Sequence, residues 1–403
     1  MAPESNLAQG SNVTRFDVLV VGAGPAGSTA ARECAARGLS TALIDRAEFP
    51  RDKPCGGGVT VRAAALLPFD IDPVVEQRVR DIRFTWRGKS GFTRRADAPL
   101  VYLTQRAKLD EFLVSKAVEA GARFFQGRRV DTVTTHEDGA TVTAGEETFD
   151  AAVLIGADGA NGPVARYLGF GMQANRGIAL EGNYPLSAGA SDMWDGTVGF
   201  DFGDVGGGYG WAFPKADHVN IGVGGWRSTG PQLRTKLAQQ ARRYGFDPSA
   251  AWGVKGHHLP VRQGKSPLWQ GRVILAGDAA GLVDPLTGEG IYAAIYSGRT
   301  AARAAASLVS REAFDLSGYE KELSAELLPE LAAGRYMHGL FHVSPRLFFN
   351  LARRRERVWS LVADLLVGQR SYLHVKRRAG KLWPVAKLGG ALVVLRPGFR
   401  KAR

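Results

Sequence analysis

The stretch FDVLVVGAGPAG at residues 16–27 decides the fold expected for this chain of 403 residues. Its first half is an apolar, β-branched run of strand length, and a helical pattern follows at residues 25–37. A second strand pattern at residues 40–44 ends at Asp45, about 20 residues after the glycines. The order strand, glycine turn, helix, strand and acid predicts the first unit of a Rossmann-type α/β domain.

The glycines of this stretch have separate physical tasks. Gly22 permits a tight turn, Gly24 lets the backbone approach a pyrophosphate, and Gly27 lets the helix pack on the strand. The helix start at Pro25 and Ala26 offers free N–H groups and a positive dipole end to phosphates. A dinucleotide is therefore expected here, with its ribose on Asp45 and the following Arg46; the alternative is a glycine-rich turn in another α/β protein.

A second decisive segment lies some 250 residues later, at residues 272–291. A short strand pattern at 272–276 delivers an acid that can bind the hydroxyls of a ribityl chain, and a helical pattern starts near Glu289. A helix N-terminus aimed at a flavin ring would stabilise negative charge on the reduced ring. A nicotinamide enzyme needs only the first segment, so the pair predicts FAD; the alternative is a packing loop. The expected contacts are Gly277, Asp278, Gly288, Gly290 and Ile291.

A third segment, residues 152–159, is a strand pattern that ends in an acidic turn at Asp158, which is a further expected cofactor contact. Together the three segments resemble the FAD-dependent group of aromatic hydroxylases, halogenases and geranylgeranyl reductases, which carries Asp-Gly in mid-chain and Gly-Asp late. The chain departs from that group at residues 161–166, where NGPVAR lacks the usual Ser before Val-Arg.

Two more motifs narrow the resemblance. FPRDKPCGGGV at residues 49–59 and YGWAFPK at 209–215 look like the signatures of geranylgeranyl reductases, and the Trp-x-Trp-x-Ile-Pro motif of halogenases does not occur. The resemblance extends from Phe16 to about Tyr372. It implies cofactor contacts from Cys55, Gly56, Gly57 and from Arg106, at the start of a helical pattern over residues 104–122.

The resemblance also implies a polyprenyl substrate: an isoprenoid lipid, a quinone or a polyprenyl diphosphate. Isolated double bonds have no carbonyl to accept negative charge, so we expect protonation of the alkene together with hydride transfer from the flavin. Cys55 is the candidate acid or proton relay; the alternative is a small buried residue. Period-two alternation puts Tyr209, Trp211 and Phe213 on one face, where the first two can stabilise a cation.

Pro214 and Lys215 end that motif and are expected to turn the chain at the flavin edge. Lys215 and Lys53 are candidates for holding a diphosphate or phospholipid head group, and a solvated lysine is the alternative for each. The electron donor that reloads the flavin stays open between a nicotinamide and a ferredoxin-like protein. No metal-ligand spacing involves the histidines at 257 and 258.

The length exceeds what one hydrophobic core supports, so several domains are expected. The fold class is α/β, with a Rossmann-type FAD domain, an antiparallel substrate sheet and a helical C-terminal region. We expect an FAD domain from residues 1–85, 103–170 and 260–312, a substrate sheet from 86–102 and 171–259, and a basic helical region over 313–403.

The net charge of +13 is concentrated at the C-terminal end. Residues 346–403 hold fifteen Lys/Arg and two Asp/Glu, which leaves 37 of each sign elsewhere. Apolar and aromatic residues interleave this charge, which suits an anionic membrane surface; the alternative is a solvated helical domain with a buried face. They are Leu347, Phe348, Phe349, Trp359, Leu365, Leu366, Tyr372, Trp383, Val393 and Val394.

Two cysteines, no signal-peptide pattern and no long apolar run predict a cytoplasmic protein, peripheral at most on the membrane face. No nucleic-acid motif occurs. The main hypothesis is an FAD-dependent reductase of isoprenoid double bonds. The rivals are a flavin monooxygenase or halogenase on the same scaffold, and a non-catalytic flavoprotein docked at a membrane.

Overall fold

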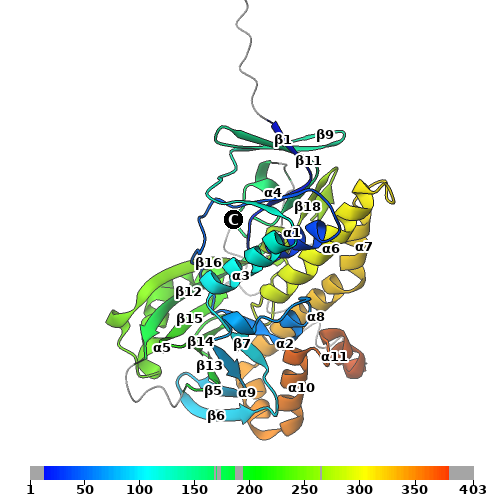
Figure 1. Ribbon diagram of the computed structural model, residues 1–403. Coiled ribbons are helices and arrows are strands. Elements are labelled where there is room, and N and C mark those ends of the chain that lie inside the picture. The colour runs from blue at the N-terminus through cyan, green and yellow to red at the C-terminus, as the bar shows by residue number, and fades with distance from the viewer. Residues whose placement is uncertain (1–12, 168, 170–173, 187–193, 264–265, 381–403) are drawn as a thin grey trace, which may run out of the picture.

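The computed structural model describes residues 13–167, 169, 174–186, 194–263 and 266–380 (Figure 1). Its first sheet has eight strands in the order β17-β18-β11-β1-β2-β8, with β10 and β9 added beside β11. The pairs among β18, β11, β1, β2 and β8 are parallel. The strands are β1 (Val13–Val21), β2 (Thr41–Ile44), β8 (Arg123–Phe125), β9 (Thr132–His136), β10 (Gly139–Ala144), β11 (Glu147–Gly156), β17 (Trp269–Gln270) and β18 (Val273–Leu275).

Three helices accompany this sheet: α1 (Pro25–Ala35), α3 (Arg106–Glu119) and α6 (Ile291–Val309). A Cβ atom on Gly298 of α6 would lie 2.4 Å from the Ala26 carbonyl oxygen, so only glycine lets α6 approach α1 this closely. That approach brings the start of α6 onto the glycine turn, although some 265 residues separate them in the chain. The predicted Rossmann-type unit is confirmed.

The second sheet has seven strands in the order β16-β12-β15-β14-β13-β5-β6. All pairs are antiparallel except β13 with β5, which run parallel and join two distant parts of the chain. The predicted antiparallel sheet is confirmed with this one exception. The strands are β5 (Asp81–Trp86), β6 (Lys89–Arg95), β12 (Ala174–Pro185), β13 (Thr197–Phe202), β14 (Tyr209–Pro214), β15 (His218–Trp226) and β16 (Trp252–Arg262).

Two predicted domain boundaries fall inside strands of this sheet. The boundary at 85/86 cuts β5, and the boundary at 259/260 cuts β16. Both strands pair over most of their length with neighbours in the second sheet, so the sheet begins at Asp81. The division of the chain into three domains stays a prediction.

The two faces of the second sheet have different partners. Helix α5 (Leu233–Arg243) packs on one face, where Ala212 and Ile221 join its buried leucines in one cluster. On the other face, Phe84 meets Trp359 at a ring distance of 6.4 Å. Helices α9 (Pro345–Arg354) and α10 (Glu356–Val367) therefore cover the β5 and β6 end of the sheet, and Figure 1 shows these orange ribbons beside β5.

The C-terminal region is helical up to residue 379, as predicted, and the part beyond 380 lies outside the described residues. None of the helices over the described ranges combines the length and apolarity that crossing a bilayer requires. The helices are α7 (Ser317–Ala325), α8 (Leu327–Val343), α9 (Pro345–Arg354), α10 (Glu356–Val367) and α11 (Tyr372–Ala379). The remaining elements are α2 (Val61–Ala64), α4 (Val164–Tyr167) and a small sheet of β3 (Gly58–Thr60), β7 (Val101–Leu103) and β4 (Gln77–Val79).

Candidate functional site

A cavity of about 1220 Å³ runs from the glycine turn of the first sheet to the covered face of the second. Its first end is lined by Gly24, Pro25, Ala26, Arg106 and the turn at 288–291. Its other end is lined by β5, β13 and β14 and by helices α8, α9 and α10. The same cavity thus joins the two predicted binding regions.

The glycine turn has room for a large group only at Gly24. A Cβ atom on Gly27 would lie 1.7 Å from the Gly22 carbonyl oxygen, and one on Gly22, whose φ is +99°, would lie 2.4 Å from the Ala157 carbonyl oxygen. A Cβ atom on Gly24 would meet only the guanidinium groups of Arg51 and Arg106, at 3.5 and 3.9 Å. The turn therefore opens toward two cations, which suits a pyrophosphate.

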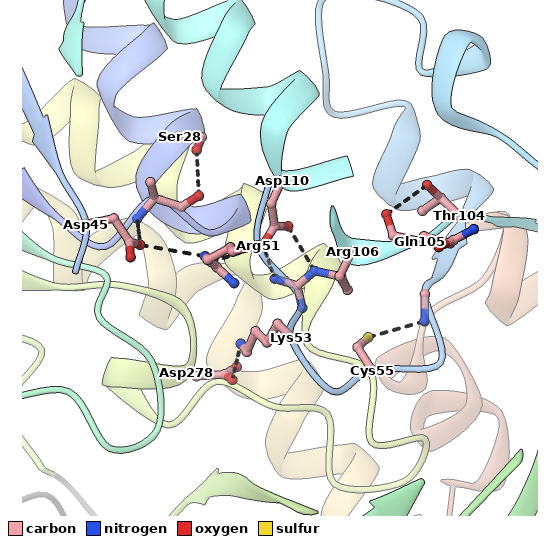
Figure 2. Close-up of polar contacts among 12 residues, drawn as sticks. Ser28, Asp45, Arg51, Lys53, Cys55, Thr104, Gln105, Arg106, Asp110 and Asp278 are labelled. Carbon is pink, nitrogen blue, oxygen red and sulfur yellow. Dashed lines mark hydrogen bonds and ion pairs between the residues drawn. The ribbon is translucent and has the colours of Figure 1, made fainter. Parts of the chain in front are cut away.

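Asp110 holds these two cations together. Arg106 donates to both carboxylate oxygens of Asp110, at 2.8 and 2.7 Å, and Arg51 Nη2 lies 3.0 Å from the same carboxylate. Figure 2 shows Asp110 between the two arginines, with Asp45 on the far side of Arg51. Burial would lower the pKa of Arg106, but Asp110 and Cys55 raise it above its usual value, so the guanidinium stays charged. Arg51 and Asp110 were missed from the sequence, although Asp110 stands four residues after Arg106 on one helix.

The other residues expected at the ribose and the pyrophosphate differ in where their side chains lie. The Asp45 carboxylate accepts hydrogen bonds from the backbone N–H groups of Ala23 and Ala47, at 2.7 and 2.9 Å. Arg46 is exposed and lies outside the lining of the cavity. Asp158 turns to the N–H of Val164, at 2.8 Å, while its neighbours line the cavity. A direct cofactor contact from Arg46 or Asp158 stays a prediction.

Asp278 lies in the cavity wall, as expected, on the short 3₁₀ helix Gly277–Ala280. Lys53 Nζ is 3.6 Å and His257 Nε2 is 3.5 Å from Asp278 Oδ2. Burial would raise the pKa of this carboxyl, but Lys53 and His257 hold it well below its usual range. Lys53, a candidate for a head group, therefore pairs with an acid at the cofactor end. Gly277 itself packs on α1, where its Cβ would lie 3.0 Å from that of Ala26.

At the turn after Asp278, Gly288, Gly290 and Ile291 line the cavity ahead of helix α6. Glu289 accepts hydrogen bonds from Thr60 Oγ1 at 2.7 Å and from Arg62 Nη2 at 2.8 Å. Its carboxylate is thereby held in an ion pair with Arg62 at the cavity wall.

The loop that carries Cys55 enters the cavity between its two ends. The Cys55 backbone N–H donates to Glu181 Oε1 at 2.6 Å, and the Gly57 N–H donates to Cys55 Sγ at 3.4 Å. Beneath the loop, Lys215 Nζ donates to the carbonyl oxygens of Gly56 and Thr104, at 2.7 and 2.9 Å. Lys215 is buried, which lowers its pKa to about 8. The Lys215 ammonium therefore fixes the Cys55 loop. Its two hydrogen bonds to backbone carbonyl groups argue against the predicted contact between Lys215 and a head group.

Glu181 of β12 is a third residue that the sequence reasoning missed. Its side chain is buried and lines the cavity beside Cys55. Burial raises the pKa of this carboxyl to about 7, against lowering by the Cys55 N–H and Asn220. An acidic residue directly after the apolar run at residues 178–180 was the available signal, but its partner is 126 residues away.

Tyr209, Trp211 and Phe213 all face the cavity from β14. Trp211 is fixed by a hydrogen bond from its Nε1 to Asn220 Oδ1 at 2.9 Å, and Tyr209 donates its hydroxyl to the Thr287 carbonyl. A Cβ atom on Gly56 would lie 2.6 Å from the Phe213 ring, so the Cys55 loop rests directly on this row. Pro214 ends the strand, buried and outside the cavity lining. Catalytic and substrate roles for these residues stay predictions.

The apolar residues of the basic region are largely used inside the fold. Phe349, Trp359 and Tyr372 are buried, and Phe348, Leu365 and Leu366 line the cavity. Leu347 is 54% exposed. Trp383, Val393 and Val394 lie outside the described residues. Membrane binding by this region stays a prediction, and the described helices behave as a domain with a buried face.

The comparisons with known proteins agree with this geometry. Residues 15–201 match the family model described as an FAD binding domain. The chain is 35% identical to a menaquinone reductase of Mycolicibacterium smegmatis over 72% of this chain and 76% of that one. It is 32% identical to a geranylgeranyl diphosphate reductase of Rhodobacter capsulatus over 93% and 95% of the two chains.

Among solved structures, a geranylgeranyl bacteriochlorophyll reductase-like protein from Thermoplasma acidophilum superposes with a TM-score of 0.75. The sequence identity is 24%, and the match covers 92% of this chain and all of the other. The open turn at Gly24, the two arginines above it and Asp278 in the cavity wall fit an FAD molecule. The chain therefore belongs to the geranylgeranyl reductase family of FAD-dependent oxidoreductases.

Proposed function

We propose that this enzyme saturates isolated carbon–carbon double bonds in an isoprenoid chain. The observation that carries the proposal is the position of the Cys55 loop and the Tyr209-Trp211-Phe213 row. Both lie in the cavity wall between the cofactor end and an end lined mainly by phenylalanine and leucine. A group bound at Gly24–Ala26 and Gly288–Ile291 would share this cavity with an apolar chain.

Saturation of an isoprenoid alkene adds a proton to one carbon and a hydride to the other, which leaves a CH and a CH₂ group joined by a single bond. When bound, reduced FAD supplies the hydride. Cys55 Sγ is the proposed proton donor, because it lies in the cavity wall beside the charged Arg106 and Lys215. Tyr209 and Trp211 offer aromatic faces to the positive charge that develops on the alkene.

The protein holds these groups in place through residues that do not face the alkene. Asn220 fixes the indole of Trp211, and Lys215 fixes the carbonyl of Gly56. Glu181 fixes the Cys55 backbone N–H and, with its pKa near 7, can exchange a proton within the physiological range. The apolar walls exclude water that would otherwise compete for the developing cation.

The experiment is product analysis under strictly anaerobic conditions. Holoenzyme reduced by dithionite is incubated with a polyprenyl substrate, and the lipid is analysed by mass spectrometry. We expect a gain of two hydrogens for each saturated bond. Both should be deuterium when the reaction runs in D₂O, because dithionite supplies only electrons and both hydrogens come from the solvent. A product that forms only after oxygen is admitted would favour the monooxygenase or halogenase rival.

The non-catalytic rival is tested by Cys55→Ala and Cys55→Ser. We expect both variants to retain FAD and to lose at least tenfold in the rate of saturation, because the proton donor is removed or weakened. Bound FAD that no substrate reoxidises, with no difference between wild type and variants, would support a carrier or docking protein.

A separate experiment identifies the electron donor. It compares NADH, NADPH and a reduced ferredoxin as reductants of the bound FAD.

A further inference from the structure

Helix α8 presents three nitrogen-rich side chains to the cavity at helical spacing: Arg335, His338 and His342. The two imidazole rings lie side by side, with their centroids 4.4 Å apart. His338 Nε2 lies 3.2 Å from the carbonyl oxygen of Gly207, which accepts its hydrogen and leaves Nδ1 as an acceptor. Neither the cofactor nor the proposed saturation step uses these side chains.

Aromatic rings complete this cluster. The Trp226 ring centroid is 5.7 Å from that of His342, and Phe341 lies 5.0 Å from the same imidazole. Phe341 also meets Phe202 of β13 at 5.4 Å. The cluster is therefore continuous with the phenylalanine-lined part of the cavity. Gly207 stands two residues before Tyr209, so it also adjoins the proposed reaction site.

The charges in the cavity wall limit what this cluster can bind. Three Lys or Arg residues occur among the described lining residues, namely Lys53, Arg106 and Arg335. Lys53 pairs with Asp278 and Arg106 with Asp110, whereas Arg335 donates to the carbonyl oxygen of Arg262. Arg335 is therefore the one cation of the described lining that pairs with no acidic side chain of the described residues. Burial lowers the pKa of His338, and burial together with His338 lowers the pKa of His342 to about 3. Both imidazoles are therefore uncharged at neutral pH.

A diphosphate carries two or more negative charges and is normally met by several cations and N–H groups. One guanidinium and two neutral imidazoles do not supply that charge. They do supply hydrogen bonds for carbonyl or hydroxyl oxygens, and the surrounding rings supply flat apolar faces for an aromatic ring.

We propose that Arg335, His338, His342 and Trp226 form the head-group site of the substrate, and that this head is an uncharged ring of the quinone or hydroquinone class rather than a diphosphate. The inference rests on the proposed function, because it takes the isoprenoid tail to lie in the neighbouring phenylalanine-lined part of the cavity. It assigns α8 a role in choosing among substrates that share the same tail.

The test compares two ligands with the same geranylgeranyl tail, a naphthoquinone and a diphosphate. Their dissociation constants for oxidised holoenzyme are measured by tryptophan and flavin fluorescence, without turnover. We expect the naphthoquinone to bind at least tenfold more tightly. We also expect His342→Phe to weaken naphthoquinone binding about tenfold and diphosphate binding less than twofold. Tighter binding of the diphosphate, or equal weakening of both ligands, would overturn the proposal.

Two controls keep the outcome interpretable. His136→Phe changes a histidine that pairs with Asp150 on β11, away from the cavity lining, and should leave both dissociation constants unchanged. If His342→Phe loses FAD, His338→Gln takes its place, and the ratio of flavin to protein is measured for each variant. The same tenfold loss of naphthoquinone binding is expected for His338→Gln, and unchanged binding would contradict the proposal. Selective naphthoquinone binding without anaerobic saturation of either tail would end the proposed function and keep the head-group site. Saturation of the tails with equal binding of both ligands would keep the proposed function and end the head-group site.

Discussion

The cofactor end of the cavity and its apolar end are stabilised in opposite ways. At the cofactor end, charged groups are buried and neutralise one another, as Asp110 does between Arg51 and Arg106. At the apolar end, rings pack edge to face, as Phe84 does on Trp359 and Phe92 on Phe349. The first arrangement fails as a unit when one charge is removed, whereas the second can be altered one ring at a time.

This difference has a functional consequence. A cofactor that stays bound through every turnover suits a rigid set of ion pairs. A cavity wall without ion pairs suits a substrate that must enter and leave. Helices cover this wall and contribute side chains to it from one face. The Cys55 loop belongs to both, because Glu181 and Lys215 tie it to the second sheet while Arg106 adjoins it at the cofactor end.

The largest effect should come from the shared carboxylate. Asp110→Ala leaves the buried Arg106 guanidinium without its carboxylate partner and leaves Arg51 with only the 3.9 Å contact to Asp45, which costs about 3–5 kcal/mol. We expect the apoprotein melting temperature to fall by about 10 °C and the purified protein to lose most of its FAD. Thermal unfolding and the ratio of absorbance at 450 and 280 nm measure both. The control Asp150→Ala removes a partly exposed partner of Arg15, His136 and Thr141 and should cost about 1 kcal/mol. Equal behaviour of the two variants would mean that the cofactor end does not depend on Asp110.

The carboxyl between the two ends should give the next effect. The pKa of Glu181 is raised from 4.5 to about 7, so the folded protein keeps a proton that the unfolded chain releases. Wild-type stability should therefore fall as the pH rises from 4.5 to 7, by about 3 kcal/mol at most. Glu181→Gln keeps the acceptor for the Cys55 N–H and should remove this loss. The difference in melting temperature between the variant and wild type should therefore rise by about 5 °C, in favour of the variant, between pH 5 and pH 8.

Glu76 provides a control with the opposite sign. Hydrogen bonds from Lys108 and the Ala216 N–H, acting against burial, lower its pKa, so it adds stability that is lost as the pH falls. Glu76→Gln should therefore weaken the protein at neutral pH and not at low pH. Parallel pH profiles for Glu181→Gln and wild type would contradict the account of Glu181.

A substitution at the apolar end should change substrate choice and leave the cofactor in place. Leu365 of α10 lines the cavity, and Leu365→Trp fills part of the space for the tail. We expect kcat/KM to fall about tenfold for a geranylgeranyl chain and by less than threefold for a geranyl chain, with FAD content unchanged. Leu347→Trp, on the exposed side of α9, is the matched control and should leave both values as they are. Loss of FAD from Leu365→Trp would show that the two ends are not independent.

The smallest effect should come from the attachment of the covering helices. Arg94 of β6 pairs with Glu356 at 2.6 Å and donates to the carbonyl oxygens of Ala352 and Arg353. Arg94→Ala should cost about 1 kcal/mol locally and raise hydrogen exchange over residues 345–367 about fivefold. Arg95→Ala, which removes an exposed ion pair to Asp81, should not change exchange there. No change in either variant would mean that ring packing alone holds α9 and α10.

The cofactor end could be predicted from the sequence because each of its features is local. Gly27 is required by a backbone contact within one strand, turn and helix, and Gly22 by the positive φ of that turn. Asp278 follows strand β18 within three residues. Arg106 and Asp110 stand one helical turn apart. Such short-range patterns carry their own geometric meaning.

The apolar end could be predicted only in part. The alternation of Tyr209, Trp211 and Phe213 correctly gave one face of a strand, but nothing local shows that α9 and α10 cover it. An amphipathic basic helix with Phe349 on one face suits a membrane surface and a protein cavity equally well. Glu181 was missed for the same reason, since its partner Cys55 is distant in the chain.

The most direct test of the central claim is the reoxidation of the bound flavin without oxygen. Anaerobic holoenzyme reduced with dithionite is mixed with a polyprenyl substrate or with its fully saturated analogue, and absorbance at 450 nm is followed. The account predicts recovery of the oxidised spectrum with the unsaturated chain and none with the saturated one. Recovery that occurs equally with both chains, or only when oxygen is admitted, would contradict it.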